Sequence, residues 1–170
     1  MRRTLVFGIM ACIASSAALA QTPSPGCSAA ESRQFDFWVG KWDVAQAKAP
    51  GKTVANSLIE KLYIGCAVRE NWMPLKTNEG GGSLNAYDSV QHKWRQFWVD
   101  SDGAITEFVG GWTGKTMILE GPENRPGKAP QTKRMTFTPK PDGSVEQLGE
   151  ITADGKSWKT EYDLIYTRAK

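Results

Sequence analysis

The side chains that could do chemistry in this sequence are carboxyl groups, amides and a single imidazole. The chain has 18 acidic residues and one histidine, His92. A serine or cysteine nucleophile needs a nearby base, which in the known triads is usually a histidine. His92 lies between Gln91 and Lys93 in a predicted turn, where we expect it to be exposed. The sequence therefore disfavours triad hydrolysis and offers no interior histidine for haem.

Two carboxyl groups, those of Glu70 and Asp100, remain candidates for acid–base chemistry. Both lie in predicted strands, and alternation places both on the interior side. A glutamate shielded from water has a raised pKa and can act as a base. Structural hydrogen bonding is the more common use of such groups, so we assign no catalytic residue.

Two short segments resemble cofactor or metal loops without meeting their requirements. Residues 110–116, GGWTGKT, are similar to a phosphate-binding loop, but their first glycine lies one residue too close and no helix is expected to follow. Residues 100–107 begin like a calcium loop but lack its third early ligand. We interpret both as turns and predict neither a metal site nor a cofactor.

Uncharged polar residues and aromatic residues recur on the same side of the predicted strands. In residues 93–100, alternate positions hold Trp94, Gln96, Trp98 and Asp100. Buried polar groups are costly unless paired, so this pattern indicates either a hydrogen-bonded network with ordered water or a ligand pocket. Aromatic walls with a few polar groups are typical of small-molecule cavities. The candidate ligand-binding residues are Glu70, Ser83, Asn85, Tyr87, Gln96, Trp98, Gln147 and Trp158.

Alternating apolar and polar runs, separated by glycine-containing turns, predict the strands that hold these side chains. Dipeptides such as Asp102-Gly103 and Asp142-Gly143 permit tight hairpins. The connections after residue 80 are too short for crossovers, so successive strands should be antiparallel neighbours. Ten strands are expected, over residues 42–49, 53–64, 66–73, 83–90, 93–100, 104–112, 115–121, 132–139, 144–152 and 157–168.

A meander of about ten strands must bury one face and protect two edges. Closure into an up-and-down barrel does both, so we predict an all-β barrel, with a two-sheet sandwich as the alternative. A barrel of this size is wide enough to hold a small ligand. Ahead of the strands, Phe35, Trp38 and Val39 predict a short amino-terminal helix within residues 28–39.

The opposite strand faces carry charged residues that we expect to point to water, among them Lys133 and Glu161. Leu84, Phe97 and Val99 are apolar residues on that outward side. We interpret them as covered by the amino-terminal helix. If they are exposed instead, they form an apolar patch that could bind a partner.

The first 20 residues have the features of a signal peptide. Arg2 and Arg3 precede an uncharged stretch that ends in small residues, and we expect cleavage near Ala20. A retained membrane anchor and a lipoprotein signal with Cys12 as the modified residue are the alternatives. Cleavage predicts a periplasmic or secreted protein with a signal peptide at 1–20, a leader at 21–27 and one domain over 28–170.

The charge balance limits the partners. Without Arg2 and Arg3, 19 basic residues remain beside 18 acidic ones. A nearly neutral domain lacks the dense basic field that nucleic acid requires. No later segment has the uncharged length of about 20 residues that a membrane-spanning helix needs. We therefore expect neither partner, and the sequence leaves the oligomeric state open.

Export would leave two cysteines, Cys27 and Cys66, in an oxidising compartment. A single disulfide is then the simplest interpretation, and two free thiols are the alternative. Closing a loop of about 40 residues would stabilise the fold by roughly 4 kcal/mol on the chain-entropy model.

Several segments share the landmarks of one protein family. They are residues 35–44 (FDFWVGKWDV), 65–72 (GCAVRENW), 83–88 (SLNAYD), 93–100 (KWRQFWVD) and 142–147 (DGSVEQ), with the closing Tyr166-x-Arg168. Together they resemble a family of exported bacterial proteins of unknown function that is regarded as lipocalin-like, or calycin-type. The resemblance covers essentially the whole mature chain. Residues 148–150, LGE, depart from it, because an aromatic residue is expected before the glutamate.

This resemblance implies a lipocalin-like barrel with a presumed small ligand and no agreed reaction. It also implies that Trp42 closes one barrel end beneath the guanidinium of Arg168. Such a contact would contribute about 1 kcal/mol where water is excluded. An ordinary core tryptophan and a solvated arginine are the alternative.

Together these features predict a barrel that binds a small hydrophobic or amphipathic molecule. One alternative is an isomerase or cyclase on the same barrel, with Glu70 as the base. Another is an interaction module that works through its outer surface at Leu84, Phe97 and Val99.

Overall fold

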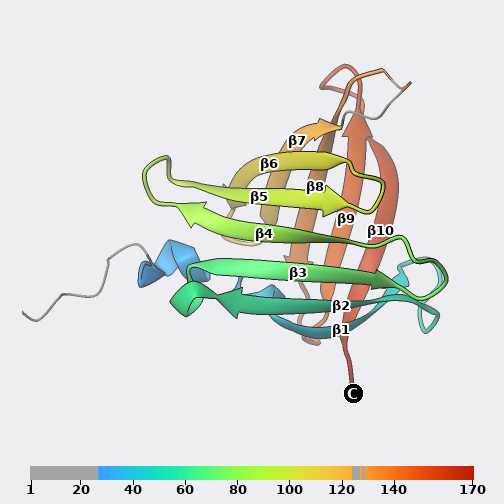
Figure 1. Ribbon diagram of the computed structural model, residues 1–170, viewed down its shortest axis with the longest axis horizontal. Coiled ribbons are helices and arrows are strands. Elements are labelled where there is room, and N and C mark those ends of the chain that lie inside the picture. Colours follow the sequence, from blue (N-terminus) through green and yellow to red (C-terminus); the bar gives the residue numbers. More distant parts are fainter. Residues whose placement is uncertain (1–26, 124–126, 128) are drawn as a thin grey trace, which may run out of the picture.

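The computed structural model describes residues 27–123, 127 and 129–170 (Figure 1). The predicted signal peptide, the lipoprotein alternative at Cys12 and the leader up to residue 26 lie outside the described residues. The described residues cover the predicted domain, 28–170, apart from residues 124–126 and 128.

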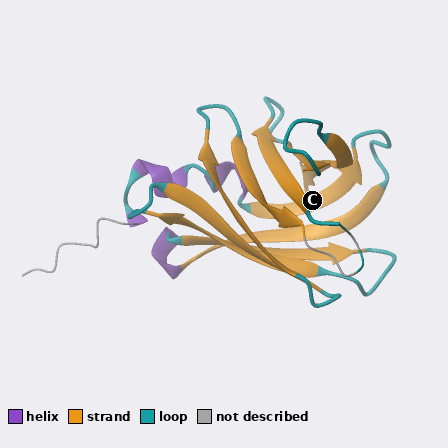
Figure 2. Cartoon of the chain, turned by 90° about the horizontal axis from the view of Figure 1, so that it is seen from above, coloured by secondary structure: helices purple, strands orange, loops and turns teal. Residues whose placement is uncertain are grey.

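The strands form one closed antiparallel meander (Figures 1 and 2). Each strand pairs with the next along the chain, and the last pairs with the first. This confirms the predicted ten-stranded closed barrel and excludes the sandwich. The strands are β1 (Gly40–Gln46), β2 (Thr53–Leu62), β3 (Ala67–Pro74), β4 (Gly81–Asp88), β5 (Lys93–Asp100), β6 (Ile105–Trp112), β7 (Met117–Glu123), β8 (Gln131–Pro139), β9 (Val145–Thr152) and β10 (Lys159–Arg168).

The hairpins form where the Asp-Gly pairs predicted them. Gly103 and Gly143 have φ of 84° and 82°, a region that glycine enters without steric cost. The carboxylate before each glycine accepts a backbone N–H two residues on, 2.8 Å from Ala104 to Asp102 and 3.0 Å from Ser144 to Asp142. Local hydrogen bonding therefore fixes both connections.

Short 3₁₀ helices replace the single helix expected at 28–39. They are η2 (Ala30–Arg33) and η3 (Asp36–Trp38), and a third, η4 (Tyr63–Gly65), lies between β2 and β3. A segment this short gains little from α-helical hydrogen bonds, so packing decides its conformation. Phe35 and Trp38 are fully buried and stack with ring centroids 4.9 Å apart. Both rings also contact Phe137 of β8, so these aromatics fill one end of the barrel.

Trp42 and Arg168 meet at the same end of the barrel. The two residues are register partners on β1 and β10, and the guanidinium carbon lies 3.9 Å from the centre of the indole. Arg168 also donates a 2.7 Å hydrogen bond to the carbonyl of Val39. A Cβ at Gly40, where φ is 149°, would lie 1.8 Å from this guanidinium. The glycine therefore gives Arg168 room to cover Trp42.

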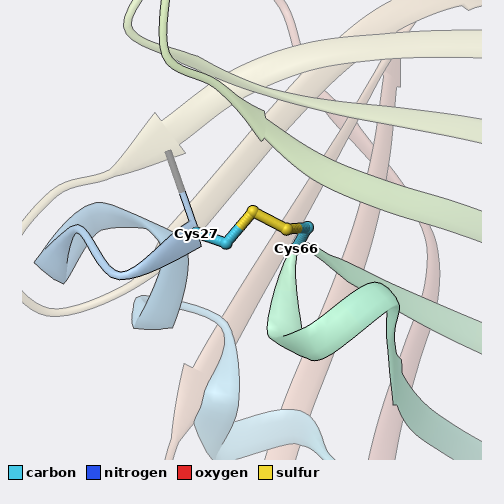
Figure 3. Close-up of a disulfide and its surroundings, with 2 residues drawn as sticks. All are labelled: Cys27 and Cys66. Carbon is cyan, nitrogen blue, oxygen red and sulfur yellow. A yellow bond between two sulfur atoms is a disulfide. The ribbon is translucent and has the colours of Figure 1, made fainter. Parts of the chain in front are cut away.

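The predicted pairing of Cys27 with Cys66 is confirmed as a disulfide (Figure 3). The two Cα atoms are 4.8 Å apart across a sequence separation of 39 residues. The bond ties the chain ahead of η2 to the turn between η4 and β3. It therefore holds the aromatic residues that follow Cys27 against this end of the barrel.

Three expectations about the strand faces are wrong. Lys133, expected in water, is buried beside Met135 of the same strand face. A β-bulge between Thr160 and Tyr162 shifts the register of β10, and Trp158, expected on the inward face, does not line the cavity. Leu84, Phe97 and Val99 are not covered by a helix: they are 42%, 43% and 43% exposed.

Candidate functional site

A cavity of about 400 Å³ occupies the half of the barrel away from η2 and η3. Its size lies within the range of known small-molecule sites, about 300 to 1,000 Å³. Its lining comes from nine of the ten strands. The lining residues are Gln46, Val54, Glu70, Trp72, Gln96, Trp98, Asp100, Ala104, Thr106, Phe108, Glu123, Lys133, Met135, Gln147, Glu161, Tyr162, Leu164 and Tyr166.

The order of the strands shows where the cavity opens. Gln46, Asp100 and Glu123 line it and are the last residues of β1, β5 and β7. Alternate strands of a meander end on the same side, so the cavity reaches the barrel end opposite the 3₁₀ helices. We call this end the mouth.

β4 provides no lining residue, and the Trp98 ring of β5 lies against its first residue, Gly81. A Cβ at Gly81 would lie 2.4 Å from the Trp98 ring. The glycine therefore lets the indole of β5 lie against the neighbouring strand. Trp98 is one of the aromatic lining residues of the cavity, with Trp72 and Phe108.

A buried chain of amides holds Gln96 in one orientation. The Asn85 side-chain NH₂ donates to the Val68 carbonyl and to Ser83 Oγ, each at 2.9 Å. A carbonyl can only accept, so this bond directs Asn85 Oδ1 toward Gln96. Gln96 Nε2 donates to that oxygen at 2.7 Å. The opposite atom, Gln96 Oε1, is buried and has no hydrogen-bond partner among the described residues.

Glu70 is the buried carboxyl group of the cavity wall, with 4% of its surface exposed. Its Oε1 accepts a 2.9 Å hydrogen bond from Ser57 Oγ and a 3.3 Å bond from the Tyr166 hydroxyl. Burial raises the pKa of Glu70 to about 7, although both hydrogen bonds act in the opposite direction. Both protonation states are therefore accessible near neutral pH.

The Tyr166 hydroxyl connects Glu70 to Gln147. It donates to Gln147 Oε1 at 2.6 Å, a shorter contact than the one to Glu70. A phenol has one proton and cannot serve both acceptors at once. Tyr166 therefore compensates the Glu70 charge only in part, which is consistent with the raised pKa of that carboxyl group.

A lysine paired with two carboxylates lies toward the mouth. Lys133 Nζ is 3.0 Å from Glu123 Oε2 and 2.8 Å from Glu161 Oε2. Lys133 is only 8% exposed, and a buried ammonium group is costly without such partners. Burial and the charges of Glu161, Glu70 and Glu123 raise the pKa of the neighbouring Tyr162, which stays a neutral phenol.

The eight predicted site residues fall into three groups. Glu70, Gln96, Trp98 and Gln147 line the cavity. Ser83 and Asn85 are buried behind it and orient Gln96. The other two do not line the cavity. Tyr87 packs on Trp94 in the aromatic cluster and contacts His92. Trp158 lies ahead of β10 and has Arg134 over its ring.

The prediction missed several residues of the site. Ser57 alternates with buried Ala55 and Ile59, so the period of β2 could have identified it. Lys133 shares its face with Met135 and was misplaced because of its charge. Glu161 reaches the cavity through the bulge in β10, for which the sequence contains no turn residue or other signal.

No protein-family model matches the sequence, and no curated protein matches it significantly. Across the described part of the chain, no group of three or more His, Cys, Asp or Glu residues is placed to hold a metal ion. The same residues contain no helix long and apolar enough to span a membrane.

Proposed function

We propose that this protein is an exported, lipocalin-like carrier that binds a small, partly apolar molecule in the cavity of its barrel. The observation that supports this most directly is a cavity of about 400 Å³ whose lining combines aromatic rings with fixed polar groups. Apolar walls provide affinity, and a few placed hydrogen-bonding groups provide orientation.

The lipocalin-like assignment rests on the segments that resemble that family and on the closed end of the barrel. There Trp42 lies beneath Arg168, the arrangement that the resemblance implies for this pair. The export assignment rests on the amino-terminal sequence and agrees with a disulfide between Cys27 and Cys66.

The closed end also limits how a ligand enters. Phe35, Trp38 and Phe137 fill that end with rings in contact. A ligand therefore enters by the mouth and brings its polar group to Glu70, Gln96 or Gln147.

The experiment that tests this function is native mass spectrometry combined with a variant whose cavity is filled. Thr106 lines the cavity, so Thr106→Trp should occupy its space. The unmodified protein should retain or take up small molecules that the Thr106→Trp variant, shown to be folded by circular dichroism, does not. Equal binding by both proteins would place the site outside the cavity.

Glu70 supports a second candidate function, an isomerase or cyclase that uses this carboxyl group as a base. A buried glutamate whose pKa is about 7 suits proton transfer near neutral pH. Glu70→Gln separates the two functions. A carrier releases its ligand unchanged in both proteins, whereas an enzyme converts the bound molecule to a product of different structure and loses this turnover in Glu70→Gln.

A further inference from the structure

We propose that the ligand of this cavity is a cationic amine with an apolar body, and that one of its N–H groups donates a hydrogen bond to Gln96 Oε1. This inference rests on the proposed function, because it specifies the chemistry of the molecule that the cavity would bind.

The first observation is the unpaired acceptor. Gln96 is 2% exposed and lines the cavity, and its Oε1 has no partner among the residues that the structure describes. The Gln96 amide cannot flip to exchange its oxygen and nitrogen. The Val68 carbonyl fixes the orientation of Asn85, whose Oδ1 then needs a donor from Gln96. A buried acceptor without a donor is costly. A ligand that donates a hydrogen bond to Gln96 Oε1 removes this cost. A ligand that places another acceptor against the same oxygen increases it.

The second observation is the sign of the charge. The described lining has four carboxyl groups, those of Glu70, Asp100, Glu123 and Glu161, and one ammonium group, that of Lys133. Lys133 already contacts two of these carboxylates. Among the described lining residues, carboxyl groups therefore outnumber ammonium groups by four to one. A cation is favoured in this environment, and a carboxylate ligand is repelled.

The third observation is the aromatic wall. Trp72 and Trp98 both line the cavity, and the face of an indole attracts a cation, most strongly where water is excluded. The same rings provide apolar contact for the body of the ligand. An amphipathic amine therefore satisfies the acceptor, the charge and the walls together.

The test compares three probes with the same eight-carbon chain: octylamine, octan-1-ol and octanoate. Isothermal titration at pH 7.5 on the full mature protein should give the tightest binding for octylamine, at least ten-fold tighter than octanoate, with octan-1-ol between them. The Thr106→Trp variant should bind none of the three in the cavity, which controls for attachment of the amine to the outer surface.

Gln96→Met is the variant that tests the acceptor, and Gln91→Met is its control. Both replace an amide by the same apolar chain, but Gln91 is exposed in the turn before β5 and does not line the cavity. The first should weaken octylamine binding at least ten-fold and leave octanoate unchanged, and the second should change octylamine binding less than two-fold. Because the probe comparison uses the unmodified protein, it decides the inference even if Gln96→Met does not fold.

The outcomes separate the two claims. Equal affinities for the three probes, or tighter binding of octanoate, would overturn the amine inference and leave the proposed carrier function standing. Absence of measurable binding by every probe would count against the carrier function itself, since the cavity would then hold only water.

Discussion

The two halves of the barrel interior follow the same strand alternation, yet one is filled and the other is hollow. In the closed half, Phe35, Trp38 and Phe137 meet with ring centroids 4.8 to 5.0 Å apart. In the half toward the mouth, long polar side chains are bonded to their neighbours on the wall, as Gln96 is to Asn85 and Glu70 to Ser57.

This difference shows how a barrel can keep a space open. Apolar rings without directional partners pack across the axis until they touch. A side chain held by a hydrogen bond to an adjacent strand cannot move to the axis without losing that bond. The polar network therefore maintains the cavity, and the aromatic cluster provides the stability that a hollow half does not.

The largest difference between the halves should appear on removing one tryptophan from each. Trp38→Ala deletes a fully buried ring and should lower the free energy of unfolding by about 4 kcal/mol. Trp98→Ala deletes a ring that already borders open space and should cost about 2 kcal/mol or less, because fewer contacts are lost. Urea unfolding measures both, and equal losses would contradict the distinction between filled and hollow halves.

The charged group near the mouth should be the next most sensitive feature. Lys133→Met removes a buried ammonium group together with its ion pairs to Glu123 and Glu161 and should cost about 3 kcal/mol. Lys140→Met is the matched control, because its pair with Glu146 at 2.6 Å is more exposed and should contribute less than about 1 kcal/mol. If the two variants unfold at the same urea concentration, Lys133 does not act as a buried charge.

Glu70 should make the hollow half sensitive to pH. Its pKa is higher in the folded protein than the ordinary value of 4.5, so the folded state binds the proton more tightly. Its contribution to stability is therefore complete below about pH 4.5 and is lost as pH rises through about 7. Between pH 5 and 7 this loss should be about 2 kcal/mol.

The Glu70→Gln variant isolates this contribution. Asp163 also has a raised pKa, caused mainly by burial, but it is present in both proteins and cancels in the difference. The stability of the unmodified protein relative to the variant should fall steadily over this interval. A difference that does not change with pH would show that Glu70 does not titrate there.

The smallest effect is expected on the outer surface. Phe97→Asp changes an exposed ring on β5, opposite Leu84 of β4. It should alter stability by no more than about 0.5 kcal/mol and leave octylamine binding unchanged. In size-exclusion chromatography we expect the same elution volume for both proteins. Loss of a dimer without unfolding would instead support an interaction surface at Leu84, Phe97 and Val99.

Much of the fold could be predicted because its signals are local. Asp102-Gly103 and Asp142-Gly143 defined hairpins, and the alternation of apolar residues located all ten strands. The inward placement of Glu70, Asn85 and Gln96 followed from the same period. These properties depend on residues close together in the chain, so one sequence was enough.

The remaining features depend on contacts between distant residues. The burial of Lys133 requires Glu123 and Glu161 from two other strands, and Glu161 arrives only through a bulge. Trp158 continued the period of β10 in the sequence but lies before that bulge, under Arg134. Strand period alone cannot predict a change of register, which is why it failed at Glu161 and Trp158.

The most direct test of the central claim is native mass spectrometry of the protein purified, without organic solvent, from the cells that make it. A hollow, ligand-binding interior predicts a fraction with additional mass from one small molecule, and the folded Thr106→Trp variant should lack it. If the unmodified protein has no additional mass and takes up none from an extract of the same cells, the cavity is not a binding site and the account is wrong.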